Sequence, residues 1–599
     1  MDYCFSPFFY SRRESRQVIV GDPNDGGVII GGQNDVVRQS MLTSDTKDTD
    51  ACVQQTLALT DVGCQIVRIT APNNKAASNL EDIVKELRKR SCRVPIVADI
   101  HFLPSAALEA VKWVEKIRIN PGNYADKKKF ATIEYSNDEY EEQLERIEKE
   151  FTPLVLLCKD LNRAMRIGTN HGSLSDRIMN RYGDTPLGMV ESALEFARIA
   201  RKNDFHNFVF SMKSSNPKVM IQCYRLLVAR LRELGPDWNY PIHLGVTEAG
   251  DGEDGRIKSA IGIGSLLADG LGETIRVSLT EDSPNEIRVC NDLLAQIPHL
   301  YNTRELSNLP EISWDPFEYS RRESSEFVSP EGSQFGATNP IRVVVTRDTW
   351  NKVSPRIHPS SDVKPEGIYE DLPITEVDPT ENFEIVTDGL VTVADGVSLP
   401  PIAAFRLLAA KLKQKNLKNP ILLKDCFESQ TEPLAPEIAL LRASVNLGSL
   451  ICDGIGDAIM VRGESGGGQS LKLAYNILQA AGSRSFKTDY VACPSCGRTL
   501  FNLQEVTAKI KDRTDHLKGV KIAIMGCFVN GPGEMADADF GYVGGAPGKI
   551  NLYVGKTPVK FNIPEGEAVD RLVDLIRENG KWVDPMQKNE KDGLAHDLI

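Results

Sequence analysis

The chain of 599 residues is longer than one hydrophobic core usually serves, and its 41% hydrophobic content can fill roughly two to four domains. Its formal net charge of -13 argues against general binding to nucleic acid or to an anionic membrane. Twelve cysteines are too few for a disulfide scaffold, and arginines interrupt the region where a signal peptide would be apolar, so we expect a cytoplasmic protein.

The first 300 residues predict a barrel. Residues 18–33 alternate around an Asn-Asp-Gly-Gly turn, which indicates a hairpin. Short β-rich runs then alternate with amphipathic helices. The eight predicted strands are 36–42, 64–71, 94–101, 115–120, 153–159, 207–213, 241–246 and 273–279, and helices between and after them include 79–90, 187–202, 217–234 and 284–297. This α/β pattern predicts a (β/α)8 TIM barrel with the hairpin at its N-terminal end. A doubly wound open sheet is the alternative, but it gives no reason to stop at eight strands.

Polar side chains recur where the predicted strands end, which is the active-site face of such a barrel. They are Arg68, Asp99, His101, Arg118, Asn120, Arg166, Asn170, Ser211, Lys213, Glu248, Arg276 and Ser278. Any one of these side chains could equally be a solvated polar residue of a loop. Solvated loops do not explain why such residues recur at the same end of successive strands. Several cations beside hydroxyl and amide groups predict a receptor for a multiply charged anion such as a diphosphate.

Two segments of this barrel recur later in the chain. Residues 7–15 return as 316–324, and residues 264–275 return as 448–459, in the same order. The region from about 310 to 485 is therefore predicted to be a shortened, degenerate copy of the barrel. The alignment places Met460 at the position of Arg276 and Arg462 at that of Ser278, so the copy has lost its anion contacts and is expected to be a structural spacer.

The C-terminal region carries a cysteine motif. Cys493 and Cys496 form a C-x2-C pair, and Cys527 follows the apolar run 520–525. Two thiolates on a turn and a third after a strand can occupy three corners of an iron–sulfur cube, which needs a fourth ligand. Zinc is the alternative, because Cys3His sites are common and His516 lies between the second and third cysteines.

The motif CPSCGRT followed by GCFVNGPGE resembles the cluster motif of the 4-hydroxy-3-methylbut-2-enyl diphosphate synthase family. RIGTNHGS, HLGVTEAG, GRIKSAIGIGSLL and DGLGETIRVSL are similar to segments of the same family. The resemblance implies that Cys493, Cys496, Cys527 and Glu534 hold a [4Fe-4S] cluster. A carboxylate holds iron less firmly than a thiolate, so a substrate oxygen can replace it.

The same resemblance implies the reaction. It is the reductive dehydroxylation and ring opening of 2-C-methyl-D-erythritol 2,4-cyclodiphosphate to 4-hydroxy-3-methylbut-2-enyl diphosphate, in the methylerythritol phosphate route of isoprenoid biosynthesis. The cyclic diphosphate would be surrounded by Arg68, His101, Arg118, Asn120, Arg166, Asn170, Lys213, Arg276 and Ser278, with Asp99 and Ser211 in the same pocket. Glu248 is the candidate proton donor, and a structural ion pair with Lys258 or Arg276 is its alternative role.

A ferredoxin or flavodoxin is the expected electron donor. Its predicted docking residues near the cluster are Arg498, Lys509, Lys511, Arg513 and Lys518. From the residues alone, a different class of function stays open. The chain could be a barrel protein that binds a phosphorylated ligand without redox chemistry and is stabilised by a zinc ion on Cys493, Cys496, His516 and Cys527.

Three domains are predicted. They are a TIM-barrel substrate domain with its hairpin at 1–298, an inserted degenerate barrel-like domain at 299–485, and a small C-terminal α+β iron–sulfur domain at 486–599. The third must close over the barrel mouth, and we expect the middle domain to hold it over its own barrel. The sequence leaves open whether the chain forms a homodimer.

Overall fold

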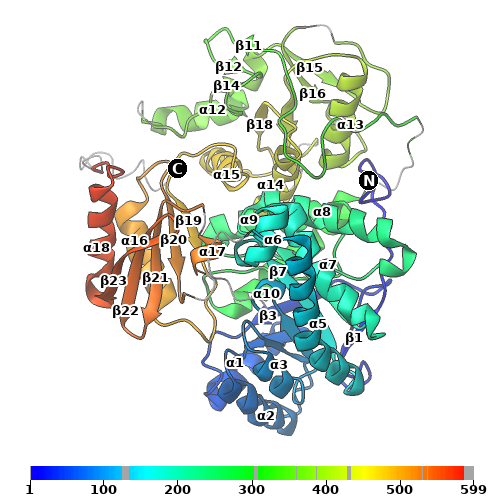
Figure 1. Cartoon of the computed structure of the whole chain (residues 1–599). Coiled ribbons are helices and arrows are strands. Elements are labelled where there is room, and N and C mark those ends of the chain that lie inside the picture. Colours follow the sequence, from blue (N-terminus) through cyan, green and yellow to red (C-terminus); the bar gives the residue numbers. More distant parts are fainter. Residues whose placement is uncertain are drawn as a thin grey trace.

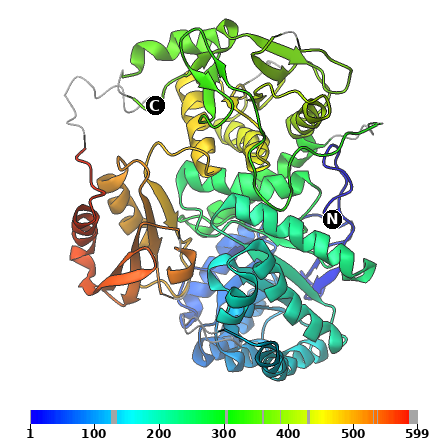
Figure 2. The same cartoon turned by 45° about the horizontal axis from the view of Figure 1, so that its top comes forward.

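The computed structural model describes residues 2–585, except 125–133, 302–305, 307, 359–360, 386, 428–432, 529–530 and 536. The end of the predicted third domain and part of its NGPGE motif therefore lie outside the described residues. Figure 1 shows a helix-covered barrel, a second sheet-and-helix body stacked above it, and a smaller sheet domain at the side. Figure 2 shows this small domain lying beside both.

The barrel is built from parallel strands. They are β3 (Val37–Met41), β4 (Ile66–Thr70), β5 (Ile96–Asp99), β6 (Lys116–Ile119), β7 (Ala164–Asn170), β8 (Phe208–Lys213), β9 (His243–Leu244) and β10 (Thr274–Ile275). Their order is β8-β7-β6-β5-β4-β3-β10-β9, and a parallel bridge between Phe210 and Ile242 joins the two edges. The sheet is thus closed, which confirms the predicted (β/α)8 barrel.

Helices cover the outside of the barrel (Figure 1). They are α1 (Thr49–Asp61), α2 (Asn74–Lys89), α3 (Pro104–Ala110), α4 (Pro121–Tyr124), α5 (Asn137–Asp160), α6 (Asp176–Tyr182), α7 (Pro186–Lys202), α8 (Pro217–Leu234), α9 (Gly252–Ala268), α10 (Ser283–Ala295) and α11 (Ile297–Leu300). Local signals set the boundaries: α7 and α8 both begin with proline after a residue, Thr185 or Asn216, whose side chain caps the helix.

The prediction of a strand at 153–159 is wrong. These residues form the last turns of α5, whose start is fixed by a capping box between Ser136 and Glu139. Phe151, Leu154, Val155 and Cys158 are buried at helical spacing. The fifth strand is β7, which begins four residues after α5 ends, so the count of eight strands is unchanged.

The N-terminal hairpin closes the bottom of the barrel. Strands β1 (Val18–Val20) and β2 (Val28–Ile30) pair in antiparallel register. Their buried side chains form one apolar cluster with Val37, Ile66, Val97, Ala164 and Val209, which lie at or near the N-terminal ends of barrel strands. Because this end is sealed by apolar contacts, a ligand can reach the polar interior only from the carboxyl end.

The middle region repeats part of the barrel. Its elements are β11 (Phe327–Val328), β12 (Gln334–Phe335), β13 (Arg342–Val345), α12 (Arg347–Val353), β14 (Gly367–Ile368), β15 (Ile374–Val377), β16 (Leu390–Val393), α13 (Pro401–Gln414), β17 (Leu422–Lys424), α14 (Pro436–Cys452), β18 (Ala458–Met460) and α15 (Gly467–Ala480). Strands β14-β13-β18-β17 form one sheet, and a bridge between Val391 and Ile421 attaches the pair β15-β16. The hairpin β11-β12 corresponds to the hairpin β1-β2 of the barrel. The parallel pairing of β13 with β18 corresponds to the pairing of β3 with β10.

The barrel and the middle region meet across helices α9 and α14. The contact is pseudo-symmetric, because equivalent residues of the two helices face each other about an approximate two-fold axis. A Cβ atom at Gly264 would lie 2.4 Å from Val445, and one at the equivalent Gly448 would lie 2.3 Å from Ile261. The side chains of Ser265 and its equivalent, Ser449, are hydrogen-bonded at 2.7 Å. Two copies of one ancestral surface therefore face each other, as in an isologous dimer.

A ring of buried charges completes this interface. The Arg225 guanidinium contacts Asp269 at 2.8 Å and Asp453 at 2.7 Å, and Arg406 contacts the same carboxylates at 2.7 and 2.8 Å. All four side chains are at most 2% exposed. One continuous apolar cluster runs from the barrel into the middle region around this ring, so the two parts behave as a single body.

The C-terminal sheet has the order β19-β20-β21-β22-β23. The strands are β19 (Asp489–Ala492), β20 (Lys521–Met525), β21 (Phe540–Ala546), β22 (Lys549–Val554) and β23 (Thr557–Pro564), accompanied by α16 (Leu503–Thr514), α17 (Gly531–Glu534) and α18 (Glu565–Glu578). This domain has its own apolar clusters. It meets the barrel of the same chain through polar contacts that include Lys258–Asp489 at 2.9 Å and Lys487–Asp254 at 2.8 Å.

Among the helices that the structure describes, none has both the length and the apolar character needed to cross a bilayer.

Replacement of Arg225 by methionine should lower the free energy of unfolding by about 3–5 kcal/mol, because the two buried aspartates would keep only one cation. Guanidinium denaturation of the full chain measures this. The matched control is Arg230→Met on the same helix, where the ion pairs are partly exposed and worth about 1 kcal/mol or less. Equal losses in the two variants would show that the ring does not stabilise the interface.

Candidate functional site

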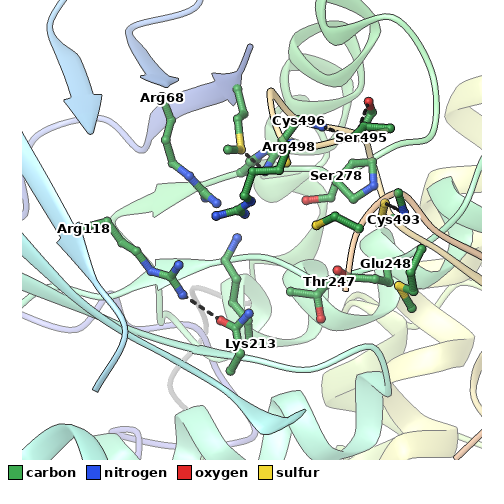
Figure 3. Close-up of a pocket in the computed structure, with 18 of the residues that line it drawn as sticks. Arg68, Arg118, Lys213, Thr247, Glu248, Ser278, Cys493, Ser495, Cys496 and Arg498 are labelled. Carbon is green, nitrogen blue, oxygen red and sulfur yellow. Dashed lines mark hydrogen bonds between the residues drawn. The ribbon is translucent and has the colours of Figure 1, made fainter. Parts of the chain in front are cut away.

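The mouth of the barrel and the edge of the C-terminal sheet line one shared cavity. Figure 3 shows cationic side chains from the barrel on one side and cysteines on the other. The lining residues are Met41, Arg68, Arg118, Arg166, Asn170, Lys213, Thr247, Glu248, Arg276, Ser278, Cys493, Pro494, Ser495, Cys496, Arg498, Thr499, Met525, Gly526 and Cys527. Segments more than 400 residues apart in sequence thus form a single site.

Five barrel cations face this cavity from strands β4, β6, β7 and β8 and from the residue after β10. They are Arg68, Arg118, Arg166, Lys213 and Arg276, all at most 9% exposed. Nitrogen atoms of Arg68, Arg118 and Arg166 are buried without a hydrogen-bond partner. Burial, with Arg166 and Arg68 nearby, lowers the pKa of Lys213 well below its usual value. Such a set of underused donors suits an incoming anion.

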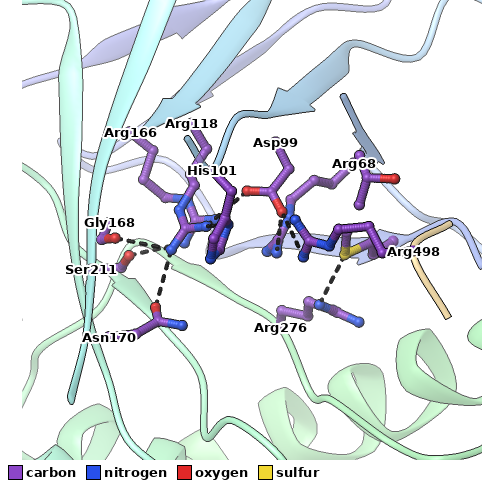
Figure 4. A network of polar contacts seen from close by, with 12 residues as sticks. Arg68, Asp99, His101, Arg118, Arg166, Gly168, Asn170, Ser211, Arg276 and Arg498 are labelled. Atoms are coloured by element: carbon purple, nitrogen blue, oxygen red, sulfur yellow. Dashed lines mark hydrogen bonds and ion pairs between the residues drawn. The ribbon is translucent and has the colours of Figure 1, made fainter. Parts of the chain in front are cut away.

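Asp99 connects the arginines (Figure 4). Its carboxylate accepts hydrogen bonds from Arg68 at 3.2 Å and Arg118 at 2.9 Å, and it lies 3.7 Å from Arg498. Burial alone would raise the pKa of Asp99, but the guanidiniums of Arg68 and Arg118 outweigh it and hold the pKa well below its ordinary value. Asp99 does not line the cavity, so it positions cations rather than facing a ligand.

Three further predicted residues lie behind the lining. His101 contacts Arg118 at 3.3 Å, Ser211 accepts a hydrogen bond from Arg166 at 2.9 Å, and Asn120 donates to Ser173 at 2.8 Å. The other predicted barrel residues all line the cavity, including Asn170, Glu248 and Ser278. Arg276 is held by Glu286 through two hydrogen bonds of 3.0 Å.

The three motif cysteines converge because of strand pairing. Cys493 follows β19 and Cys527 follows β20 after Gly526, and these strands are parallel neighbours whose carboxyl ends meet at one edge. The Gly526 N–H donates to the Cys493 sulfur at 3.3 Å, and the Cys496 N–H donates to Thr499 at 3.1 Å. No described cysteine forms a disulfide. Burial raises the pKa of the Cys493 thiol, and the charge of Glu248 adds to this effect.

Two buried carboxylates lie near the boundary between the barrel and the C-terminal domain, and Glu248 lines the cavity with the thiols. Glu534 accepts hydrogen bonds from Asn170 at 2.9 Å and Thr247 at 3.2 Å, so a residue of the C-terminal domain is held by the barrel. Glu248 has the left-handed backbone angle φ of 49° and one oxygen without a partner. Burial raises the pKa of Glu248 to about 8, and the nearby Glu534 contributes. Lys258 and Arg276, the partners considered for a structural ion pair, bind Asp489 and Glu286 instead.

The zinc alternative requires His516 to join the cysteines. His516 instead bonds the Val583 carbonyl at 2.8 Å and packs on Trp582, and it does not line the cavity. Within the described residues no group of three or more His, Cys, Asp or Glu side chains is arranged around a single metal ion. Three thiols line one cavity, while His516, the fourth ligand of the zinc alternative, does not.

The prediction that Arg498 lies on a surface for an electron donor is wrong. Its side chain is 9% exposed and lines the cavity near Asp99. Because Arg498 lies in the same loop as Cys496, the sequence could have predicted that its side chain is near the cavity. Thr247, which binds Glu534, was missed because a lone threonine carries no pattern. Lys509, Lys511, Arg513 and Lys518 pair with Glu505, Asp251, Asp570 and Asp362 respectively.

Comparisons with known proteins identify the family of the chain. Residues 16–291 match the GcpE TIM-barrel domain and residues 489–578 match the GcpE protein C-terminal domain. A 4-hydroxy-3-methylbut-2-en-1-yl diphosphate synthase (flavodoxin) of Akkermansia muciniphila is 56% identical over 591 residues, covering 97% of this chain and 99% of that protein. The chloroplastic, ferredoxin form of Arabidopsis thaliana is 41% identical over 674 residues, covering 98% of this chain and 90% of that protein.

Identity of this extent over nearly the whole length includes the middle region as well as both matched domains. The chain therefore belongs to the GcpE family, the family of the 4-hydroxy-3-methylbut-2-en-1-yl diphosphate synthases.

Proposed function

We propose that the chain reduces and opens 2-C-methyl-D-erythritol 2,4-cyclodiphosphate to 4-hydroxy-3-methylbut-2-enyl diphosphate, using a [4Fe-4S] cluster. The observation that carries this is the shared cavity, where anion-binding arginines and three thiols face the same space. Family membership gives the reaction. The arrangement supports it, because a substrate held by its diphosphate would present its hydroxyl-bearing carbons to the thiol side (Figure 3).

The barrel cations bind the diphosphate. Arg68, Arg118 and Arg166 offer unpartnered N–H groups, and Lys213 projects from the end of β8. Guanidinium groups match the oxygen geometry of a diphosphate, and a cavity with little water strengthens each contact. Because Asp99 and Glu286 already orient three of these arginines, little side-chain freedom is lost on binding.

Cys493, Cys496 and Cys527 would hold the cluster, with Glu534 as the fourth ligand. When bound, the cluster supplies single electrons and a Lewis-acidic iron. Glu534 sits between the two domains, bonded to Asn170 and Thr247. These two barrel residues would orient the Glu534 carboxylate toward the cluster and keep it in place.

Glu248 is positioned to deliver a proton. Its raised pKa, about 8, keeps the carboxyl protonated at neutral pH, and it lines the cavity on the thiol side. A buried acid with this pKa can protonate a departing oxygen, and its unpartnered oxygen leaves room for that contact.

The relatives are named for flavodoxin or ferredoxin as donor, and the same class of protein serves this chain. Exposed cations for docking remain on and near α16, at Lys509, Arg513 and Lys518, whose side chains are 59, 46 and 52% exposed. These residues replace the predicted set, from which Arg498 and Lys511 are removed, because Arg498 lines the cavity and Lys511 pairs with Asp251 of the barrel.

Glu534→Ala should retain the brown colour of the protein but lose turnover, because the three thiolates remain and the exchangeable ligand is gone. Anaerobic absorption spectra with iron and sulfide analysis, about four of each per wild-type chain, measure the first part. Glu505→Ala on exposed α16 is the control and should keep both properties. A colourless wild-type protein with one zinc would overturn the cluster assignment.

Glu248→Gln should keep its iron and its affinity for inorganic pyrophosphate but lose turnover by about 10²-fold or more, because the amide keeps the shape and cannot donate the proton. Steady-state kinetics with a chemical reductant and calorimetric titration separate the two effects. Unchanged turnover would remove Glu248 from the mechanism.

A further inference from the structure

Arg498 crosses from the C-terminal domain into the mouth of the barrel. It follows the loop of Cys493 and Cys496, and it is the one basic residue that this domain contributes to the lining of the cavity. Figure 3 shows its guanidinium on the same side as Arg68 and Arg118. The groups that interact with its charge are the Cys496 sulfur, which also accepts a hydrogen bond from it, the Asp99 carboxylate and the Cys527 sulfur.

The bonding of Arg498 is incomplete. Its Nε and Nη1 atoms are buried and have no hydrogen-bond partner. Asp99 does not supply one: its nearest contact with Arg498 is through Nη2 at 3.7 Å, longer than a hydrogen bond, whereas Arg118 and Arg68 bond to the carboxylate at 2.9 and 3.2 Å (Figure 4). Three guanidiniums therefore share one carboxylate. A buried guanidinium with unused donors beside a cavity requires a further acceptor.

The contact between the two domains is of the kind that a ligand can strengthen. The C-terminal domain has its own apolar clusters and meets the barrel through ion pairs and hydrogen bonds, including Lys258–Asp489, Lys487–Asp254 and Asn170–Glu534. Polar interfaces between domains of one chain generally permit relative movement. An anion that bonds to both sides would add contacts only in the closed arrangement.

We propose that Arg498 binds the diphosphate of the substrate from the side of the C-terminal domain, so that the bound anion joins this domain to the barrel. The inference rests on the proposed function, because it assigns a further residue to the same anion site. It makes substrate binding and closure of the cysteine loop a single event. The barrel arginines then supply most of the affinity for the diphosphate. The contribution of Arg498 to that affinity is present only when the C-terminal domain is closed over the barrel.

The test uses the full-length protein, purified anaerobically with its bound metal, and inorganic pyrophosphate as the probe in low salt. Calorimetric titration of Arg498→Gln should show binding weakened about tenfold or more, because a charge-assisted contact is lost. Lys487→Gln breaks another ion pair between the same domains, away from the cavity, and should bind within about twofold of wild type. Arg498→Lys keeps the charge and should be intermediate.

Hydrogen exchange gives a second readout that does not depend on turnover. Pyrophosphate should protect the backbone of residues 493–499 in wild type and in Lys487→Gln, but not in Arg498→Gln. Arg118→Gln separates this inference from the proposed function, since it removes a barrel contact. If Arg118→Gln loses binding and Arg498→Gln does not, the role of Arg498 is wrong and the anion site stands. If neither variant loses binding, both assignments are wrong.

Discussion

More positive charge is buried at the carboxyl end of the barrel than its carboxylates neutralise, and the position of Asp99 makes that arrangement stable. Like charges in a water-poor interior repel strongly, so each added arginine would destabilise the empty barrel. Asp99 lies between Arg68 and Arg118, and Glu286 holds Arg276. Arg166 and Lys213 have no carboxylate partner among the described residues. This uncompensated charge is what an anionic ligand would satisfy.

Helix α9 is the element at which all three parts of the chain meet. Its middle packs against α14 at Gly264, its Lys258 binds Asp489 of the C-terminal sheet, and its Asp254 binds Lys487. The same helix begins four residues after Glu248. The rigid, two-fold-like contact with the middle region therefore supports one side of the active-site mouth, and the C-terminal domain rests on that support through polar contacts.

The carboxylates of the site show how one cavity can assign different roles to similar groups. Asp99 is surrounded by guanidiniums, so its pKa falls and it stays charged. Glu248 faces the thiol side without a cation partner, so burial and the neighbouring Glu534 raise its pKa to about 8. Environment rather than residue type makes the first a fixed anion and the second a proton donor.

Much of this could be read from the sequence, because it depends on local order along the chain. Alternating strand and helix periods predicted the barrel, recurring segments predicted the degenerate copy, and the spacing of Cys493, Cys496 and Cys527 predicted their convergence. The strand prediction at 153–159 failed because a short apolar run does not by itself distinguish a buried helix from a strand, and the capping box lies 17 residues earlier.

The contacts between distant segments were decided only by the tertiary structure. Asp99 positions Arg68 and Arg118, Arg498 turns inward instead of facing solvent, and Glu534 is held by Asn170 and Thr247. These facts depend on how the C-terminal sheet sits against the barrel, and no periodicity encodes the relative placement of two domains. The sequence by itself determined which chemical groups are present and in which elements they lie. Packing decided which groups face one another, because burial and charge pairing act across space rather than along the chain.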